Sequence, residues 1–101
     1  MTDMMTYSLL RKFQRSKDFV EQFRIILSLA RMYNIKIDYE LANEVIVNLP
    51  FAIEVREELK NSVYAYKLPQ KVSENLKNAE EIFRECIKLL HQKAKIPVQV
   101  L

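Results

Sequence analysis

Residues 72–90 read VSENLKNAEEIFRECIKLL, and this stretch decides the fold of the chain. Its apolar positions are spaced four, three, four, three and four residues apart, which places them on one helix face for almost three heptads: Val72, Leu76, Ala79, Phe83, Cys86 and Leu90. Pro69 stands just before the stretch, and proline fits the first turn of a helix. The pattern predicts a long helix that buries this seam against neighbouring helices.

The same period continues toward the N-terminus. After a short leading segment around 7–13, a helix is predicted over 17–33 with Ser16 as its N-cap. This helix has an unusually wide apolar stripe, formed by Phe19, Phe23, Ile25, Ile26, Leu27, Leu29, Ala30 and Met32. A stripe of that width indicates a central helix that several neighbours contact.

Two further helices are predicted in the middle of the chain. Asp38 is the expected N-cap of a short helix over 39–47. Pro50 then predicts a helix boundary and a new helix over about 50–66, because a proline amide is not needed in a first turn. The apolar side of that helix would consist of Ala52, Val55, Leu59, Val63 and Tyr66.

Glycine is absent from the 101 residues, whereas average usage would put about seven in a chain of this length. The absence excludes the Walker loop and the dinucleotide fingerprint, and it argues against hairpin-rich folds. We therefore expect an all-α fold that turns without left-handed backbone: a compact bundle of four to five helices in one domain, 1–101, with a non-helical extended tail over 95–101. Disorder, an extended wrap and a strand borrowed by a partner are the three fates open to that tail.

Cysteine and histidine each occur once, as Cys86 and His91. This count excludes an internal disulfide framework and a cysteine-based zinc site, so we expect no metal, no small-molecule cofactor and a buried, unreactive Cys86. No apolar run approaches the roughly 20 residues that span a bilayer, and the N-terminus lacks a signal-peptide pattern. We expect a cytoplasmic protein with no membrane contact; abundant lysine, glutamate and isoleucine would suit a thermophile or an archaeal virus.

The charges are arranged in blocks. Residues 1–36 hold seven Lys/Arg against three acids, 37–59 hold one against six, and 60–101 hold eight against four. One interpretation is that antiparallel helices of opposite sign attract each other within the molecule. The other is that the basic blocks meet an acidic partner or nucleic acid.

The N-terminal segment is the strongest candidate for anion binding. Arg11, Lys12, Arg15 and Lys17 lie within seven residues, and Tyr7 and Phe13 are close enough in sequence to pack or to stack on a base. A few such contacts would give salt-sensitive binding to a phosphate backbone. The alternative is that these cations are simply solvated at a chain terminus.

Arg84 and His91 resemble the Arg-x4-6-His motif of HEPN-domain ribonucleases over eight residues, RECIKLLH. That family is small, all-helical and usually dimeric, and the resemblance implies that these two residues act on the scissile phosphate of RNA. The other interpretation is that Arg84 pairs with Glu80 or Glu81, while His91 lies exposed near a helix C-terminus.

Residues 39–55, YELANEVIVNLPFAIEV, resemble a helix-turn-helix in their apolar rhythm. The resemblance implies a DNA-reading second helix that begins near Pro50 and carries Glu54 and Glu57. A structural two-helix corner is the alternative.

The apolar stripes exceed what a bundle of this size requires, which favours a homodimer or docking onto another protein. We therefore expect a small non-catalytic accessory or adaptor protein that works through helix surfaces, in association with a protein partner or itself and within a nucleic-acid-handling complex. The alternatives are an RNA- or DNA-binding protein that uses the N-terminal cations and a HEPN-like ribonuclease that uses Arg84 and His91.

Overall fold

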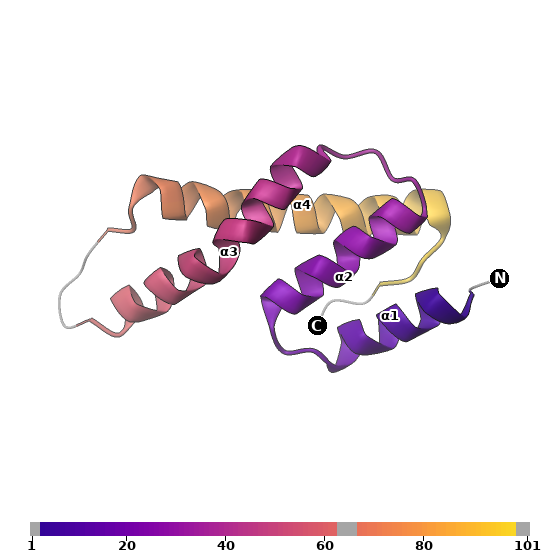
Figure 1. The fold of residues 1–101 in the computed structure, drawn as a ribbon, viewed down its shortest axis with the longest axis horizontal. Coiled ribbons are helices and arrows are strands. Elements are labelled where there is room, and N and C mark those ends of the chain that lie inside the picture. The colour runs from indigo at the N-terminus through magenta and orange to yellow at the C-terminus, as the bar shows by residue number, and fades with distance from the viewer. Residues whose placement is uncertain (1–2, 63–66, 99–101) are drawn as a thin grey trace.

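The computed structural model describes residues 3–62 and 67–98. These residues form four helices: α1 (Met4–Arg15), α2 (Phe19–Met32), α3 (Tyr39–Lys60) and α4 (Gln70–Ala94) (Figure 1). The described ranges contain no strand, which confirms the predicted all-α fold class. The predicted helix residues Val63 and Tyr66 lie outside the described residues.

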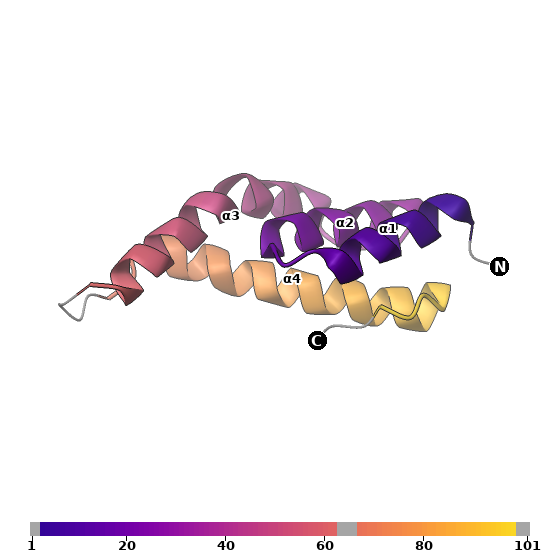
Figure 2. The same ribbon diagram turned by 90° about the horizontal axis from the view of Figure 1, so that it is seen from below.

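Helix α2 is central, because it packs against all three other helices, and α3 crosses α4 and packs against it (Figure 1). The far halves of α3 and α4 extend beyond α1 and α2 (Figures 1 and 2). The molecule measures 52 × 27 × 19 Å and has a radius of gyration of 15.0 Å, whereas a spherical domain of this length has about 13 Å. The C-terminal part of α3 and the N-terminal part of α4 therefore form an arm, 53–62 with 67–74, that projects from the core.

The predicted seam of α4 faces the core. Five of its six members are buried and Leu76 is half-buried; the buried members are Val72, Ala79, Phe83, Cys86 and Leu90. Phe83 sits in an aromatic cluster with ring centroids 6.1 Å from Phe13, 5.0 Å from Phe19 and 6.4 Å from Phe23. The cluster joins α1, α2 and α4. Each aromatic pair contributes roughly 0.5–1.5 kcal/mol beyond its buried area, so the cluster stabilises the packing of these helices.

Helix α2 begins two residues later than predicted, and its N-cap is Asp18 rather than Ser16. The Asp18 carboxylate accepts a hydrogen bond from the Val20 amide at 3.0 Å, and a carboxylate also suits the positive end of a helix dipole. Ser16 instead ends α1, because its amide donates to the carbonyls of Lys12 and Phe13. The predicted Ser16 cap was therefore wrong.

Helix α3 runs without interruption through Pro50, so the predicted boundary there was wrong. Proline removes one amide donor from the helix interior, which is costly in isolation. Leu49 and Ala52 on either side are buried, however, while the Pro50 ring faces solvent, so packing holds the helix together. Both the helix-turn-helix and the two-helix corner are excluded, because the turn that they require is helical.

Two of the residues that the structure describes adopt left-handed backbone although the chain has no glycine, which corrects the expectation that it avoids this conformation. Asn34 has φ 55° and Lys95 has φ 57°. Asn34 ends α2: its amide donates to the Arg31 carbonyl at 3.2 Å, and the next amide, of Ile35, donates to the Ala30 carbonyl at 2.9 Å. This is a Schellman ending, in which asparagine replaces the usual glycine.

The described part of the tail, 95–98, is not helical and packs back on the core. The Leu90 carbonyl accepts from the Ile96 amide at 3.0 Å, Ile96 is buried, and Val98 is half-buried against the core. Of the three fates open to the tail, these residues show the wrap. Among the described helices, none combines the length and apolar character needed to cross a membrane.

Candidate functional site

The orientation of α1 is fixed by two inward-facing residues. Thr6 is buried and its Oγ1 lies 2.6 Å from the Tyr33 hydroxyl oxygen at the end of α2, in a hydrogen bond. Phe13 lies in the core about two turns later. The Asp3 carboxylate caps α1 by accepting from the Thr6 amide at 2.8 Å, and this hydrogen bond lowers the pKa of Asp3. With that face fixed, the cations of α1 turn outward.

The four predicted anion-binding residues are all exposed, and the structure gathers three of them on α1. Arg11 and Arg15 share the outer face, and Lys12 lies one position round the helix toward α2. Lys17 stands in the link between α1 and α2. The Arg11 guanidinium lies over the Tyr7 ring, 5.7 Å from its centroid, so this arginine is held against an exposed aromatic face.

An open groove between α1 and α2 was not predicted. We call it the methionine groove; it has a volume of about 850 Å³ and is lined by Met4, Met5, Ser8, Leu9, Lys12, Ser28, Arg31 and Met32. Met4 and Met5 are 87% and 64% exposed, which is unusual for large apolar side chains. The groove therefore combines an apolar lining with two cations, one from each helix.

Arg31 is held at the junction of α2 and α3. It donates to the Asn43 Oδ1 at 2.8 Å, and its guanidinium lies 5.2 Å from the centroid of the Tyr39 ring. Tyr39 in turn donates to the Ile35 carbonyl at 2.6 Å, and burial raises the pKa of its hydroxyl. These contacts hold the Arg31 charge at one side of the groove.

A second surface, also not predicted, follows the outer side of α3. Six exposed residues are spaced four, three, four, three and four apart, so they form one stripe along the helix: Glu40, Glu44, Val47, Phe51, Glu54 and Glu58. Val47 is 76% exposed and Phe51 is 65% exposed. We call this the acidic stripe; it has an apolar centre and two carboxylates toward each end.

Beside the acidic stripe, a smaller groove of about 500 Å³ lies between α3 and α4, with Phe51 among its lining residues. Its lining combines apolar residues with polar ones, among them Asn48, Asn75 and Asn78. The buried Asn75 Nδ2 has no hydrogen-bond partner in the described part of the chain. Because Phe51 lines this groove and also belongs to the acidic stripe, the two surfaces adjoin each other.

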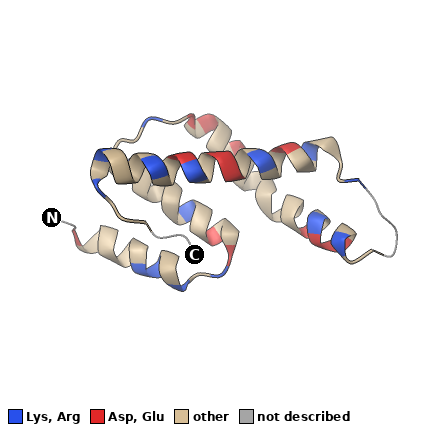
Figure 3. Cartoon of the chain, turned by 180° about the vertical axis from the view of Figure 1, so that it is seen from behind, with Lys and Arg blue, Asp and Glu red and all other residues tan. Residues whose placement is uncertain are grey.

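The charged residues of the three blocks do not form ion pairs between helices in the described ranges. Within 3–62 and 67–98, the ion pairs are Arg56–Glu57 at 3.6 Å and Arg84–Glu80 at 3.7 Å, and each joins two residues of one helix. Figure 3 shows both signs of charge along α4, whereas α1 carries only Lys and Arg after its cap. The close interhelix pairing that one interpretation requires is therefore absent from the described residues.

Arg84 and His91 lie on the exposed outer face of α4, seven residues and about 10 Å apart along the axis. Arg84 is held by Glu80, and neither residue lines either of the two grooves above. Cys86 lies on the opposite, buried face, where burial raises the pKa of its thiol to about 11. No group of three or more potential metal-ligating side chains occurs in the described ranges.

The chain matches no protein-family model, and neither the curated proteins nor the solved structures contain a match. Its own surfaces are therefore the basis for a functional proposal.

Proposed function

We propose that this chain is a small non-catalytic accessory protein, an adaptor that binds other proteins through the methionine groove and the acidic stripe. The observation that carries the proposal is the exposure of Met4, Met5, Val47 and Phe51 on surfaces whose charged side chains form no ion pair between helices within 3–62 and 67–98. Large apolar side chains that stand together at a surface are typical of protein-binding sites.

The two surfaces belong to different helices and have opposite charge. The groove lies between α1 and α2 and carries Lys12 and Arg31, whereas the stripe lies on α3 and carries carboxylates. Two chemically distinct surfaces on one small domain suit a protein that joins two partners. The basic α1 is the reason to look for those partners in a nucleic-acid-handling complex.

The experiment uses the purified chain as bait in nuclease-treated extract of the source cells. Two surface variants accompany the wild type: a groove variant, Met5→Glu with Lys12→Glu, and a stripe variant, Val47→Lys with Phe51→Lys. All four residues are exposed, so both variants should fold. The adaptor proposal expects specific proteins that the wild type retains and that one variant loses.

Charge-matched controls place the same changes on the outer face of α4, at exposed positions. Lys77→Glu with Gln92→Glu matches the groove variant, and Ser73→Lys with Gln92→Lys matches the stripe variant. The proposal fails if wild type, surface variants and controls retain the same proteins, since neither surface would then select a partner.

Direct nucleic-acid binding is the second candidate, and the exposed row Arg11, Arg15 and Lys17 with the Arg11–Tyr7 contact favours it. Band-shift titrations of labelled RNA and DNA across a salt series test it. Binding through these cations should weaken steeply with salt, and Arg11→Ala with Arg15→Ala should weaken it about equally for all sequences. Lys77→Ala with Lys88→Ala on α4 is the matched control.

A HEPN-like ribonuclease is the remaining alternative, and its support is the common exposed face of Arg84 and His91. If the chain is an adaptor, the wild type leaves labelled RNA intact during long incubation. Cleavage by the wild type that Arg84→Ala and His91→Ala both abolish would establish the ribonuclease instead.

A further inference from the structure

We infer that the methionine groove of one copy of this chain holds the acidic stripe of a second copy. The inference rests on the proposed function, in which both surfaces bind proteins, and it names the occupant of the groove. It follows from the charge, the spacing and the apolar content of the two surfaces.

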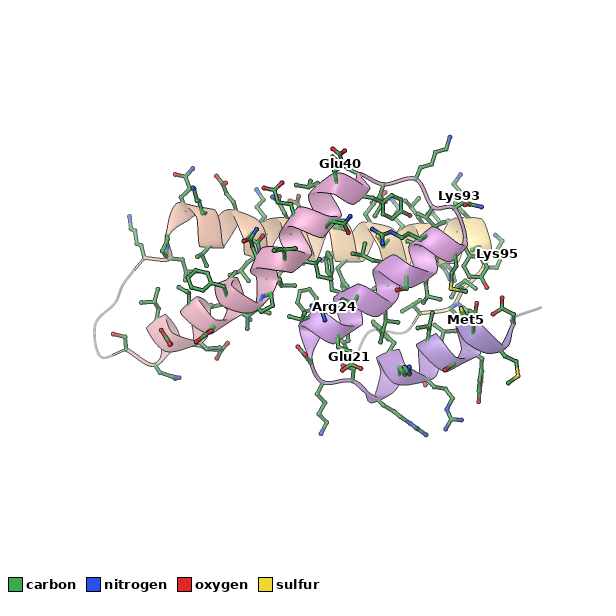
Figure 4. The ribbon with its side chains drawn as sticks, in the orientation of Figure 1. Met5, Glu21, Arg24, Glu40, Lys93 and Lys95 are labelled. Carbon is green, nitrogen blue, oxygen red and sulfur yellow. The ribbon has the colours of Figure 1, made fainter. Side chains whose placement is uncertain are left out.

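The two surfaces are complementary in charge. The stripe presents four carboxylates and no cation: Glu40, Glu44, Glu54 and Glu58. Lys12 and Arg31 line the groove, and Arg15 and Arg24 are exposed on the same two helices. No Asp or Glu is among the residues that line the groove: Asp3 caps α1, and Glu21 lies with Arg24 at the start of α2 (Figure 4). Cations therefore dominate the groove as carboxylates dominate the stripe.

The spacing of charge and apolar side chain also agrees. On α1, Met5 and Lys12 are seven residues apart, which is about 10 Å along the axis. On α3, Glu40 precedes Val47 by seven residues and Glu58 follows Phe51 by seven. Beyond Met5, Lys95 stands at the same end of the molecule (Figure 4). An apolar centre about 10 Å from charge thus occurs on both partners.

The apolar parts give the contact its interior. Val47 and Phe51 are largely exposed, and so are Met4 and Met5. Methionine side chains adapt to the shape of a partner, so Met4, Met5 and Met32 would fit around an inserted phenylalanine. Nucleic acid would leave those methionines uncovered, because its phosphates use only the cations, so the observations favour a helix as the occupant.

A symmetric dimer in which two stripes face each other is disfavoured, because it places four carboxylates against four. The groove-to-stripe contact is head-to-tail, so each copy keeps one groove and one stripe for further copies. Such a contact produces rings or open chains rather than a closed pair. It should also weaken with salt, since it depends on exposed charges.

Sedimentation velocity of the purified full chain is the first test. In about 50 mM salt, the mean mass should rise continuously from low micromolar to near-millimolar protein, and in about 500 mM salt the apparent dissociation constant should be at least about tenfold weaker. The groove variant and the stripe variant should each remain monomeric under all of these conditions. The two α4 control variants should associate as the wild type does.

Mixing the two surface variants is the decisive measurement. The groove variant keeps an intact stripe and the stripe variant keeps an intact groove, so an equimolar mixture should associate where neither variant does so alone. A symmetric interface would not be rescued, because each variant would bring one damaged half. Fluorescent labelling of one variant follows this association without interference from the other.

The inference is overturned if the wild type stays monomeric, if it forms a closed dimer that mixing fails to rescue, or if the controls disrupt association as strongly as the surface variants. It is also overturned if labelled RNA occupies the groove, that is, if RNA binds the wild type and the groove variant loses it. The adaptor proposal would survive a monomeric result, because surface-dependent capture of other proteins is measured separately.

Discussion

At the scale of single residues, Lys95 holds a backbone conformation that a β-carbon disfavours, with φ 57° and ψ 34°. We predict that Lys95→Gly stabilises the protein by about 0.5–1 kcal/mol, because glycine removes the left-handed penalty but loses more entropy on folding. Urea unfolding followed by circular dichroism measures the change. Lys95→Ala should give no such gain, which separates backbone relief from the loss of charge.

Lys93→Gly is the matched control, since Lys93 lies within the last turns of α4 and is also exposed. Glycine there should destabilise the protein by up to about 1 kcal/mol. A gain from Lys95→Gly that is no larger than the effect of Lys95→Ala would contradict the role given to the left-handed conformation.

Cys86 should make the stability depend on pH in the alkaline range. Burial raises the pKa of its thiol from the usual 9.0 to about 11. Between these two values the unfolded chain has released a proton that the native chain keeps, so the free energy of unfolding falls as pH rises, and the effect is complete above about 11. Below 9.0 the thiol is protonated in both states and contributes no slope.

The measurement is the urea midpoint of wild type and Cys86→Ala across this range. The variant is less stable at neutral pH because it leaves a small cavity, but its midpoint should fall less steeply between about pH 9 and 11. Parallel pH profiles for the two proteins would show that the thiol remains protonated equally in both states.

Local sequence rules predicted the capping role or backbone conformation of some residues and not of others. Asp38 caps α3 as predicted, accepting from the Leu41 amide at 3.0 Å. Ser16 and Asp18 both have the chemistry of a cap; α2 begins at Phe19, whose ring packs on Phe83, and Asp18 directly before it is the N-cap. The left-handed conformations of Asn34 and Lys95 were not predicted, because the chain contains no glycine. A sharp turn is nevertheless required before a buried residue such as Ile35, and Asn34 adopts it.

At the scale of the helices, α3 continues through Pro50 although proline removes a donor from its interior. We predict that Pro50→Ala stabilises the protein by about 1–2 kcal/mol, because the recovered hydrogen bond outweighs the entropy that proline removes from the unfolded chain. Thermal and urea unfolding measure this gain. Asn48→Ala, at another exposed position of α3, should change stability far less than Pro50→Ala does.

The helices whose positions follow from apolar periodicity alone were predicted correctly. The seam of α4 and the wide stripe of α2 were confirmed almost residue by residue, because an uninterrupted apolar pattern has only one helical interpretation. The middle of the chain was divided wrongly at Pro50. There the local preference of proline was overridden by the burial of Leu49 and Ala52, which is a property of the assembled core.

At the scale of the whole molecule, the candidate site was the least predictable part. The cations of α1 were predicted, but the methionine groove needs Met4 and Met5 of α1 beside Met32 of α2. That placement follows from the Thr6–Tyr33 hydrogen bond and the core position of Phe13. Sequence periodicity within one helix contains no information on which face of another helix lies opposite.

The arm should be the least protected part of the structure. Beyond Ala52, no described residue of α3 is fully buried, whereas Ala79, Phe83, Cys86 and Leu90 of α4 are buried in the core. Because local opening costs less where fewer apolar contacts are broken, we predict roughly tenfold or faster hydrogen exchange in residues 53–61 than in 79–90. Mass spectrometry of pepsin fragments measures both segments in one experiment.

Two variants separate the arm from the core. Leu59→Ala should speed exchange in the arm and leave 79–90 unchanged. Phe83→Ala should speed exchange in both segments, because it weakens the core on which the arm depends. Equal protection of the two segments would mean that the four helices unfold as one unit.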